Sequence, residues 1–203
     1  MEMANEGQAW SWREQRKYIR ELSPYLLASI SLLIAGALLG VAIAARAPDI
    51  SAARREALGE FAGFFMGLPT PLLALAIFLN NAVKTLVVIL AGVFAGILPL
   101  VFLLINGFVL GIVFHAMLHT KGLWAFIVAV APHGILELPA VLLGTSIGLM
   151  MGMHAIRRFI KKERIEISPQ LGRGVRFFAT VILPLLVVSA LIEAFITAPL
   201  SGK

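Results

Sequence analysis

Residues 85–118 read "TLVVILAGVFAGILPLVFLLINGFVLGIVFHAML". This stretch contains no Asp, Glu, Lys or Arg. A helix crosses the hydrocarbon core of a bilayer with about 20 apolar residues, so the stretch is long enough for two spans. Gly96 and Pro99 favour a tight turn within it, which predicts one span over residues 82–98 and another over 100–118. The stretch therefore indicates a helical membrane protein, because a transmembrane barrel would show short alternating segments instead.

The composition of the whole chain agrees with this class. Of its 203 residues, 60% are hydrophobic and 14% are charged, and the mean hydropathy is +0.94. Soluble domains have about 45–50% apolar and about 25% charged residues. The chain has no cysteine, which excludes disulfides and cysteine metal sites. The net charge of +6 does not indicate nucleic-acid binding, because the basic residues gather beside a predicted span.

Three further apolar runs complete the expected transmembrane domain, which covers residues 24–199. They predict a first span over 24–45, a fourth over 123–156 and a fifth over 175–199. The polar residues 1–23 form an N-terminal segment, and the first span is read as a permanent anchor rather than a cleaved signal peptide. The expected fold is an all-α, polytopic helical bundle with about five transmembrane helices.

Basic residues set the expected orientation. The N-terminal segment and the predicted polar loop 157–174 both carry clusters of Lys and Arg. Four predicted crossings separate them, so both are expected in the cytoplasm and the C-terminus outside. The sequence therefore predicts a multi-pass protein of the cytoplasmic membrane.

Two segments outside the long spans have helical patterns of their own. Residues 8–23 fit either a short amphipathic helix or a solvated terminus. Ser51 can cap a second helix, expected over 51–66 on the outer membrane surface, whose apolar residues recur at spacings of three and four. These residues are Leu58, Phe61, Phe64 and Phe65.

The start of the second span has two possible forms. Residues 72–79 are too short to cross a bilayer, and Asn80 and Asn81 are favoured helix N-caps. A half-helix over 72–79, followed by a span from Ala82, is therefore expected. The alternative is one continuous helix over residues 72–95.

Residues 132–140, "PHGILELPA", predict a break in the fourth span. Pro132 and Pro139 each remove a backbone donor, and Gly134 loosens the turn between them. Broken helices at membrane depth are tolerated only where they are buried in protein or line a wet cavity. His133 and Glu137 stand four residues apart, on one face of any helix that joins them. They are weak candidates for metal ligands, because the second histidine of an HExxH motif is missing.

Polar residues within the spans are expected between the bilayer middle and its outer face. An isolated membrane carboxylate costs about 2.5–3.5 kcal/mol, so these residues are expected to satisfy one another. His133, Glu137, Asn106 and Glu193 are predicted to form one cluster. It is either a packing contact or the lining of an outward cavity. The full set of candidates, in which the first three are expected at the outer start of the second span, is Asn80, Asn81, Lys84, Asn106, His133, Glu137 and Glu193.

Pairs of glycines four residues apart indicate close helix packing. They occur within "GVFAG" at residues 92–96, at Gly107 and Gly111, and at Gly144 and Gly148. These pairs exceed what one short bundle needs. Together with the surface helix, they lead us to expect a homodimer or a higher oligomer.

Three stretches resemble the stage II sporulation protein M family. They are "NNAVKTLVVILAGVFAGILPLVFLLINGFVLGIV", "PHGILELPA" and "LIEAFIT". The resemblance covers roughly residues 24–199 and implies a five-span protein of the cytoplasmic membrane. In spore-forming bacteria, the family acts with cell-wall hydrolases during engulfment. By resemblance, the motif positions are Asn81, Asn106, Pro132, His133, Gly134, Glu137, Pro139 and Glu193.

Two classes of function follow from these observations. The first is a non-enzymatic scaffold that binds membrane or cell-surface proteins. The second is a transporter, channel or lipid-handling protein that works through an outward polar cavity around His133 and Glu137. An intramembrane enzyme ranks third, because no nucleophile pairs with these residues in the sequence. No cofactor is predicted, and the lipid bilayer is the one certain partner.

Overall fold

The computed structural model describes residues 11–46 and 68–197, with the backbone alone at 129–134, 196 and 197. The described part is helical and contains no strand. Its elements are α1 (Trp12–Arg46), α3 (Thr70–Ala91), α4 (Ile97–Thr120), α5 (Leu123–Phe159), α6 (Ile167–Phe177), η1 (Phe178–Ile182), α7 (Leu183–Ile192) and η2 (Glu193–Thr197). The surface helix predicted over residues 51–66 lies outside the described residues.

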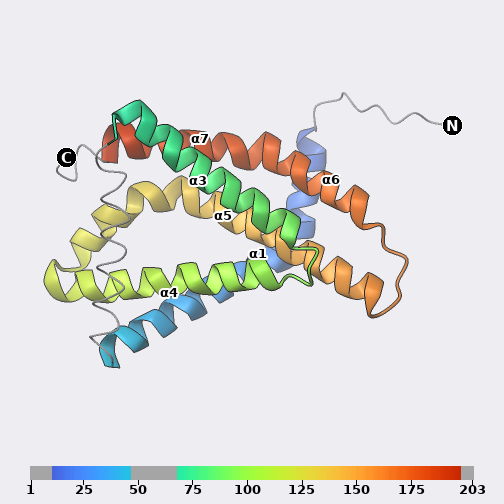
Figure 1. Ribbon diagram of the computed structural model, residues 1–203, viewed down its shortest axis with the longest axis horizontal. Helices are drawn as coiled ribbons and strands as arrows, with labels where there is room; N and C mark the ends of the chain where they lie inside the picture. Colours follow the sequence, from blue (N-terminus) through green and yellow to red (C-terminus); the bar gives the residue numbers. More distant parts are fainter. Residues whose placement is uncertain (1–10, 47–67, 198–203) are drawn as a thin grey trace.

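Five helical stretches in this part of the chain are long and apolar enough to cross a membrane. The last of them joins α6, η1, α7 and η2 into one rod, with two π-helical segments inside it. The all-α membrane bundle is therefore confirmed. The central element is α5, which packs against α1, α3, α4 and α7. Figure 1 shows α5 passing between α3 on one side and α4 on the other.

The first span begins earlier than the sequence predicts. α1 starts at Trp12, so the amphipathic segment and the span are one continuous helix that passes through Pro24. Ser11 and Glu14 form a capping box: the Ser11 backbone N–H donates to Glu14 Oε2 at 2.8 Å, and the Glu14 N–H donates to Ser11 Oγ at 3.3 Å. Pro24 cannot donate to the Arg20 carbonyl, and the Ser23 hydroxyl donates there instead at 2.8 Å. This replacement bond explains why the helix continues.

The second span is one helix, and the predicted half-helix over 72–79 is wrong. α3 starts at Thr70 with a proline in its first turn and continues through Asn80 and Asn81. Asn80 Nδ2 donates to Asn81 Oδ1 at 3.3 Å. Asparagine is a good N-cap where water can take over the freed backbone groups, whereas ending a helix in the bilayer leaves those groups unsatisfied. The continuous alternative is therefore the correct one.

The turn between the second and third spans lies before Pro99. It covers residues 92–96 and ends in two left-handed residues, Ala95 with φ of 55° and Gly96 with φ of 72°. Pro99 then sits buried in the first turn of α4, where its missing N–H needs no partner. The spans therefore end at Ala91 and begin at Ile97, earlier than predicted.

The fourth span is bent and not broken. α5 is helical from Leu123 to Phe159, through both Pro132 and Pro139, so the predicted interruption is wrong. Figure 1 shows the helix changing direction between its yellow first part and its orange last part. A proline removes one bond of the ladder and commonly kinks a helix where the neighbouring bonds hold it together.

The predicted basic loop 157–174 is largely helical. Only residues 160–166 connect α5 to α6, which starts at Ile167. Further along this rod, η1 precedes Pro184, which stands in the first turn of α7. The wider π-turn brings the Leu183 N–H to the Phe178 carbonyl, five residues back. It thereby makes room for a proline ring inside a span.

Glycines bring α1 and α4 together as parallel helices. A Cβ atom on Gly36 or Gly40 would clash with the Leu104 or Phe108 carbonyl of α4. The α4 glycines of the sequence pair, Gly107 and Gly111, meet the α1 backbone in the same way. Backbones this close exchange dispersion and Cα–H···O contacts that larger residues prevent.

A second glycine contact joins α3 and its following turn to α5. Gly92 meets the backbone of Gly148, and Gly96 faces Gly152. Gly144 faces the Thr85 side chain, where a Cβ would clash with Cγ2. All three predicted glycine pairs are therefore used within one chain. The argument from surplus glycines no longer supports a homodimer, which stays a prediction that needs other support.

Candidate functional site

Glu137 lies on the glycine face of α5. It precedes Gly144 by seven residues, or two helical turns, so both share the face that packs on α3. Gly148 continues this face and also contacts the Pro99 ring of α4. The Glu137 side chain is partly buried. Helical phase therefore places Glu137 on the same side of α5 as Gly144 and Gly148.

Two other predicted polar residues lie on the helices that pack against α5. Lys84 of α3 precedes Val88, whose carbonyl contacts Gly148, by one turn. Asn106 of α4 is two turns after Pro99. Both side chains are exposed, and Asn106 Nδ2 donates to the Phe102 carbonyl at 2.7 Å. That bond satisfies the amide within its own helix, and the grouping of Asn106 with the carboxylates stays a prediction.

Glu193 belongs to η2, a segment that also packs on α3. It opens the π-helical segment η2 and is partly buried. The next residue, Ala194, packs on Leu73 and Ala74 in the first turns of α3. Both intramembrane glutamates therefore belong to elements that pack on α3. His133 lies on α5, one turn before Glu137, with only its backbone described, so its place in the cluster stays a prediction.

The polar residues of α3 lie deeper than predicted. Because α3 starts at Thr70, Lys84 lies 14 residues, or about 21 Å, from the N-terminal end of the helix. It lies seven residues, or about 10 Å, from the other end at Ala91. Asn80 and Asn81 are near the middle of the helix. Their predicted position at the outer start of the span is wrong because the helix begins at Thr70, ten residues before Asn80.

A buried hydroxyl network joins α1 to α5, and the sequence analysis missed it. Ser29 Oγ and Ser146 Oγ are 3.1 Å apart, and Thr145 Oγ1 donates to Ser29 Oγ at 3.4 Å. The Val141 carbonyl lies 2.9 Å from the same Thr145 Oγ1, so the single hydroxyl hydrogen is shared between the two acceptors. All three side chains are fully or almost fully buried. Hydroxyls in spans usually bond their own backbone, so only small residues at the same depth on two spans, as in "ASIS" and "GTSIG", hint at such a contact.

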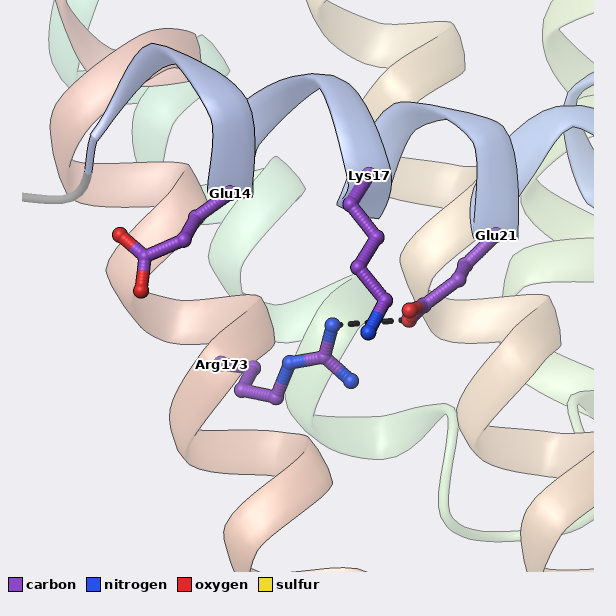
Figure 2. A pocket seen from close by; sticks show the side chains of 4 residues that line it. All are labelled: Glu14, Lys17, Glu21 and Arg173. Carbon is purple, nitrogen blue, oxygen red and sulfur yellow. Dashed lines mark hydrogen bonds and ion pairs between the residues drawn. The ribbon is translucent and has the colours of Figure 1, made fainter.

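Near the start of α1, side chains of α1 and α6 line an open, charged cavity of about 280 Å³, in which Glu14 and Lys17 are exposed and Glu21 and Arg173 are partly buried. Figure 2 shows its four lining side chains: Glu14, Lys17 and Glu21 project from one side of α1, and Arg173 rises from α6 to meet them. Arg173 Nη2 donates to Glu21 Oε2 at 2.8 Å, and Nη1 donates to Gln170 Oε1 at 3.0 Å.

The floor beside this cavity is aromatic. Tyr18 is fully buried, and its ring centroid lies 5.1 Å from that of Phe177. The Arg173 guanidinium carbon lies 5.0 Å from the Tyr18 ring centroid. This contact and the ion pair with Glu21 hold the guanidinium in one place. The sequence analysis missed the cavity because it depends on two segments about 150 residues apart.

No group of three His, Asp or Glu side chains able to hold a metal ion occurs in the part of the chain whose side chains are described. Since the His133 side chain lies outside that part, the weak metal candidates His133 and Glu137 stay untested.

Comparison with known proteins identifies the family. The family model for stage II sporulation protein M matches residues 13–198. The chain belongs to this family. No curated protein and no solved structure matches the chain. The stage II sporulation protein M match covers all five spans, both π-helical segments and the four residues of the charged cavity. It identifies the chain as a membrane-spanning protein of the sporulation type.

Proposed function

We propose that this member of the stage II sporulation protein M family is a non-enzymatic scaffold that holds partner proteins at the cytoplasmic membrane. The observation that carries the proposal is the place of Lys84. Its side chain is exposed on α3 although the residue lies well inside a span. A cation facing lipid costs about 2.5–3.5 kcal/mol at the centre of a span on the insertion scale, which is the upper value for Lys84, and a partner carboxylate would lower this cost.

The direction of the side chain strengthens this argument. Lysines in spans often extend toward the nearest membrane surface. The nearest surface for Lys84 lies at the C-terminal end of α3, whereas Cα–Cβ bonds in a helix tilt toward the N-terminus. The first bond of the Lys84 side chain therefore points toward the middle of the bilayer, away from the nearest surface. Beside it, α3 exposes a row of apolar side chains on which a partner span can pack: Leu72, Leu75, Leu79, Val83, Val87 and Leu90.

A crosslinking experiment in the native membrane tests the scaffold. A photoreactive amino acid at Val83 or Val87 should capture a partner span, and the same amino acid at Leu38 of α1, which is also exposed, serves as the positional control. Lys84→Met should abolish the α3 crosslinks while the protein level stays unchanged. A crosslink to a second copy of the chain would support a homodimer.

Charge reversal completes the test. Once the partner's acidic residue is mapped, Lys84→Glu should lose the complex, and an acid-to-lysine change in the partner should restore it. If Lys84→Met leaves every crosslink intact, the scaffold proposal fails at this surface.

A second candidate function is transport or lipid handling through the outer half of the bundle. It is favoured by the two partly buried glutamates on elements that pack on α3, because Glu193 opens a π-helical segment and such segments occur often at functional sites. Glu137→Gln keeps the shape and hydrogen bonding of the side chain but removes its charge. Under this function the variant should keep its thermal stability and lose ion, proton or lipid handling, whereas the scaffold should retain partner binding.

A further inference from the structure

We infer that the cavity between α1 and α6 binds the headgroup of a zwitterionic phospholipid, in which a phosphate is joined by two carbons to a primary ammonium. The cavity combines two cations and two carboxylates in about 280 Å³. A purely anionic ligand would leave the carboxylates facing it, and a purely cationic ligand would meet Lys17 and Arg173. A group with both charges fits the set.

The part of the cavity nearest the apolar segment of α1, at Glu21, lies at the level of a headgroup. Glu21 and Lys17 precede the apolar part of α1, which starts at residue 24, by three and seven residues. These separations correspond to about 5 Å and about 10 Å along the helix. The headgroup layer extends about 5–8 Å beyond the hydrocarbon core on each side. Glu21 therefore lies within this layer and Lys17 just beyond it, while Glu14, ten residues before residue 24, lies about 15 Å out and can meet only the outermost end of a headgroup. Acyl chains attached to a headgroup in this cavity can therefore enter the bilayer beside the two helices.

The side chains that line the cavity have further hydrogen-bond acceptors and donors for the two charged groups of the ligand. Glu14 and Glu21 use their Oε2 atoms for the contacts with Ser11 and Arg173. The Oε1 atoms are the expected acceptors for a primary ammonium. At the other end, the Lys17 ammonium points along the same side of α1 (Figure 2). It is the expected donor to the phosphate, together with the remaining N–H groups of Arg173.

The Arg173 side chain is preorganised for such a ligand. Its contacts with Gln170, with Glu21 and with the Tyr18 ring fix the guanidinium before anything binds. A phosphate that meets a fixed guanidinium loses less conformational freedom on binding than one that meets a mobile side chain. The site is distinct from Lys84 and from Glu137, so the inference stands apart from the proposed function.

Lipid competition measured by native mass spectrometry tests the inference. The purified full-length chain is exposed to equal amounts of phosphatidylethanolamine, phosphatidylcholine and phosphatidylglycerol with matched acyl chains. Retention of phosphatidylethanolamine should exceed that of the other two by about tenfold. The quaternary ammonium of phosphatidylcholine cannot donate hydrogen bonds, and the glycerol of phosphatidylglycerol carries no positive charge for the carboxylates.

Variants assign the two ends of the headgroup. Lys17→Gln should lower retention of phosphatidylethanolamine and of phosphatidylglycerol alike. Arg16→Gln makes the same charge change at an exposed residue outside the cavity and should leave retention unchanged. Glu14→Gln keeps a residue that suits the capping box. It should remove the preference for phosphatidylethanolamine over phosphatidylglycerol without loss of helix content.

A competition experiment with a soluble compound tells whether the cavity binds a membrane lipid or a small molecule with the same headgroup. Glycerophosphoethanolamine, which has the same headgroup and no acyl chains, should compete only at far higher concentration. If it binds as tightly as the lipid, the lipid source is wrong. Equal retention of the three lipids, or equal effects of Lys17→Gln and Arg16→Gln, would overturn the inference.

Discussion

At the residue scale, single hydrogen bonds decide where this chain departs from sequence rules. Pro24 should start a helix, yet the Ser23 hydroxyl supplies the missing bond to Arg20 and the helix continues. Asn80 and Asn81 should cap a helix, yet they lie inside α3. Sequence preferences for caps and prolines describe chains in water, where solvent accepts the freed backbone groups. Within a bilayer the cost of a free backbone group favours continued helix.

One residue-scale prediction concerns the loop after α5. Arg157 Nε donates to Glu163 Oε2 at 2.7 Å, and this contact lowers the pKa of the Glu163 carboxyl below its ordinary value. The pair therefore stabilises the folded loop above the ordinary glutamate pKa, and the contribution is lost as the pH falls through the lowered folded-state pKa. A carboxyl NMR titration should show the Glu163 midpoint rising toward its ordinary value in Arg157→Gln. An unchanged midpoint would mean that the ion pair is absent in solution.

At the element scale, glycine determines which spans can touch. Adding a Cβ at Gly111 of α4 forces it against the Ala37 carbonyl of α1, where backbone cannot move aside. Gly111→Ala should lower the free energy of unfolding by about 1–3 kcal/mol. Gly172→Ala in α6 is the matched control, because nothing lies within 4 Å of the added carbon. It should be neutral or slightly stabilising, since alanine favours helix over glycine by about 0.5–1 kcal/mol. Unfolding in micelles would compare the two, and equal effects would refute the packing.

The presence of five spans follows from the sequence, while the exact bounds of the helices and their packing partners do not. Long apolar runs predict a span wherever they occur, so all five spans were identified from hydropathy alone. The contact of Glu21 with Arg173 depends on α1 and α6 meeting across the bundle. Nothing in either segment indicates the other. Pro132 and Pro139 predict a break in the fourth span, but α5 stays one helix, because the backbone bonds on either side of each proline hold it together.

At the scale of the whole molecule, the orientation in the membrane stays a prediction that the chain makes easy to test. Its lack of cysteine allows single-cysteine variants without background labelling. Ser11→Cys and Glu166→Cys should react with a membrane-impermeant reagent only after the cells are opened. Lys121→Cys, in the connection between α4 and α5, should react in intact cells. The reverse labelling pattern would mean that the orientation is inverted and that the charged cavity lies outside the cell.

The parallel pairing of α1 with α4 has a consequence for the synthesis of the protein. Leu104, which covers Gly36, is made 68 residues after it. At translation rates of about 5–20 residues per second, roughly 3 to 14 s pass between the synthesis of Gly36 and that of Leu104. The glycine face of α1 has no helix partner in the membrane during this time. During that interval lipids or an insertion chaperone must cover a groove shaped for another helix. Ribosome pausing within residues 47–96 would lengthen this exposure, whereas a slow stretch after α4 would not.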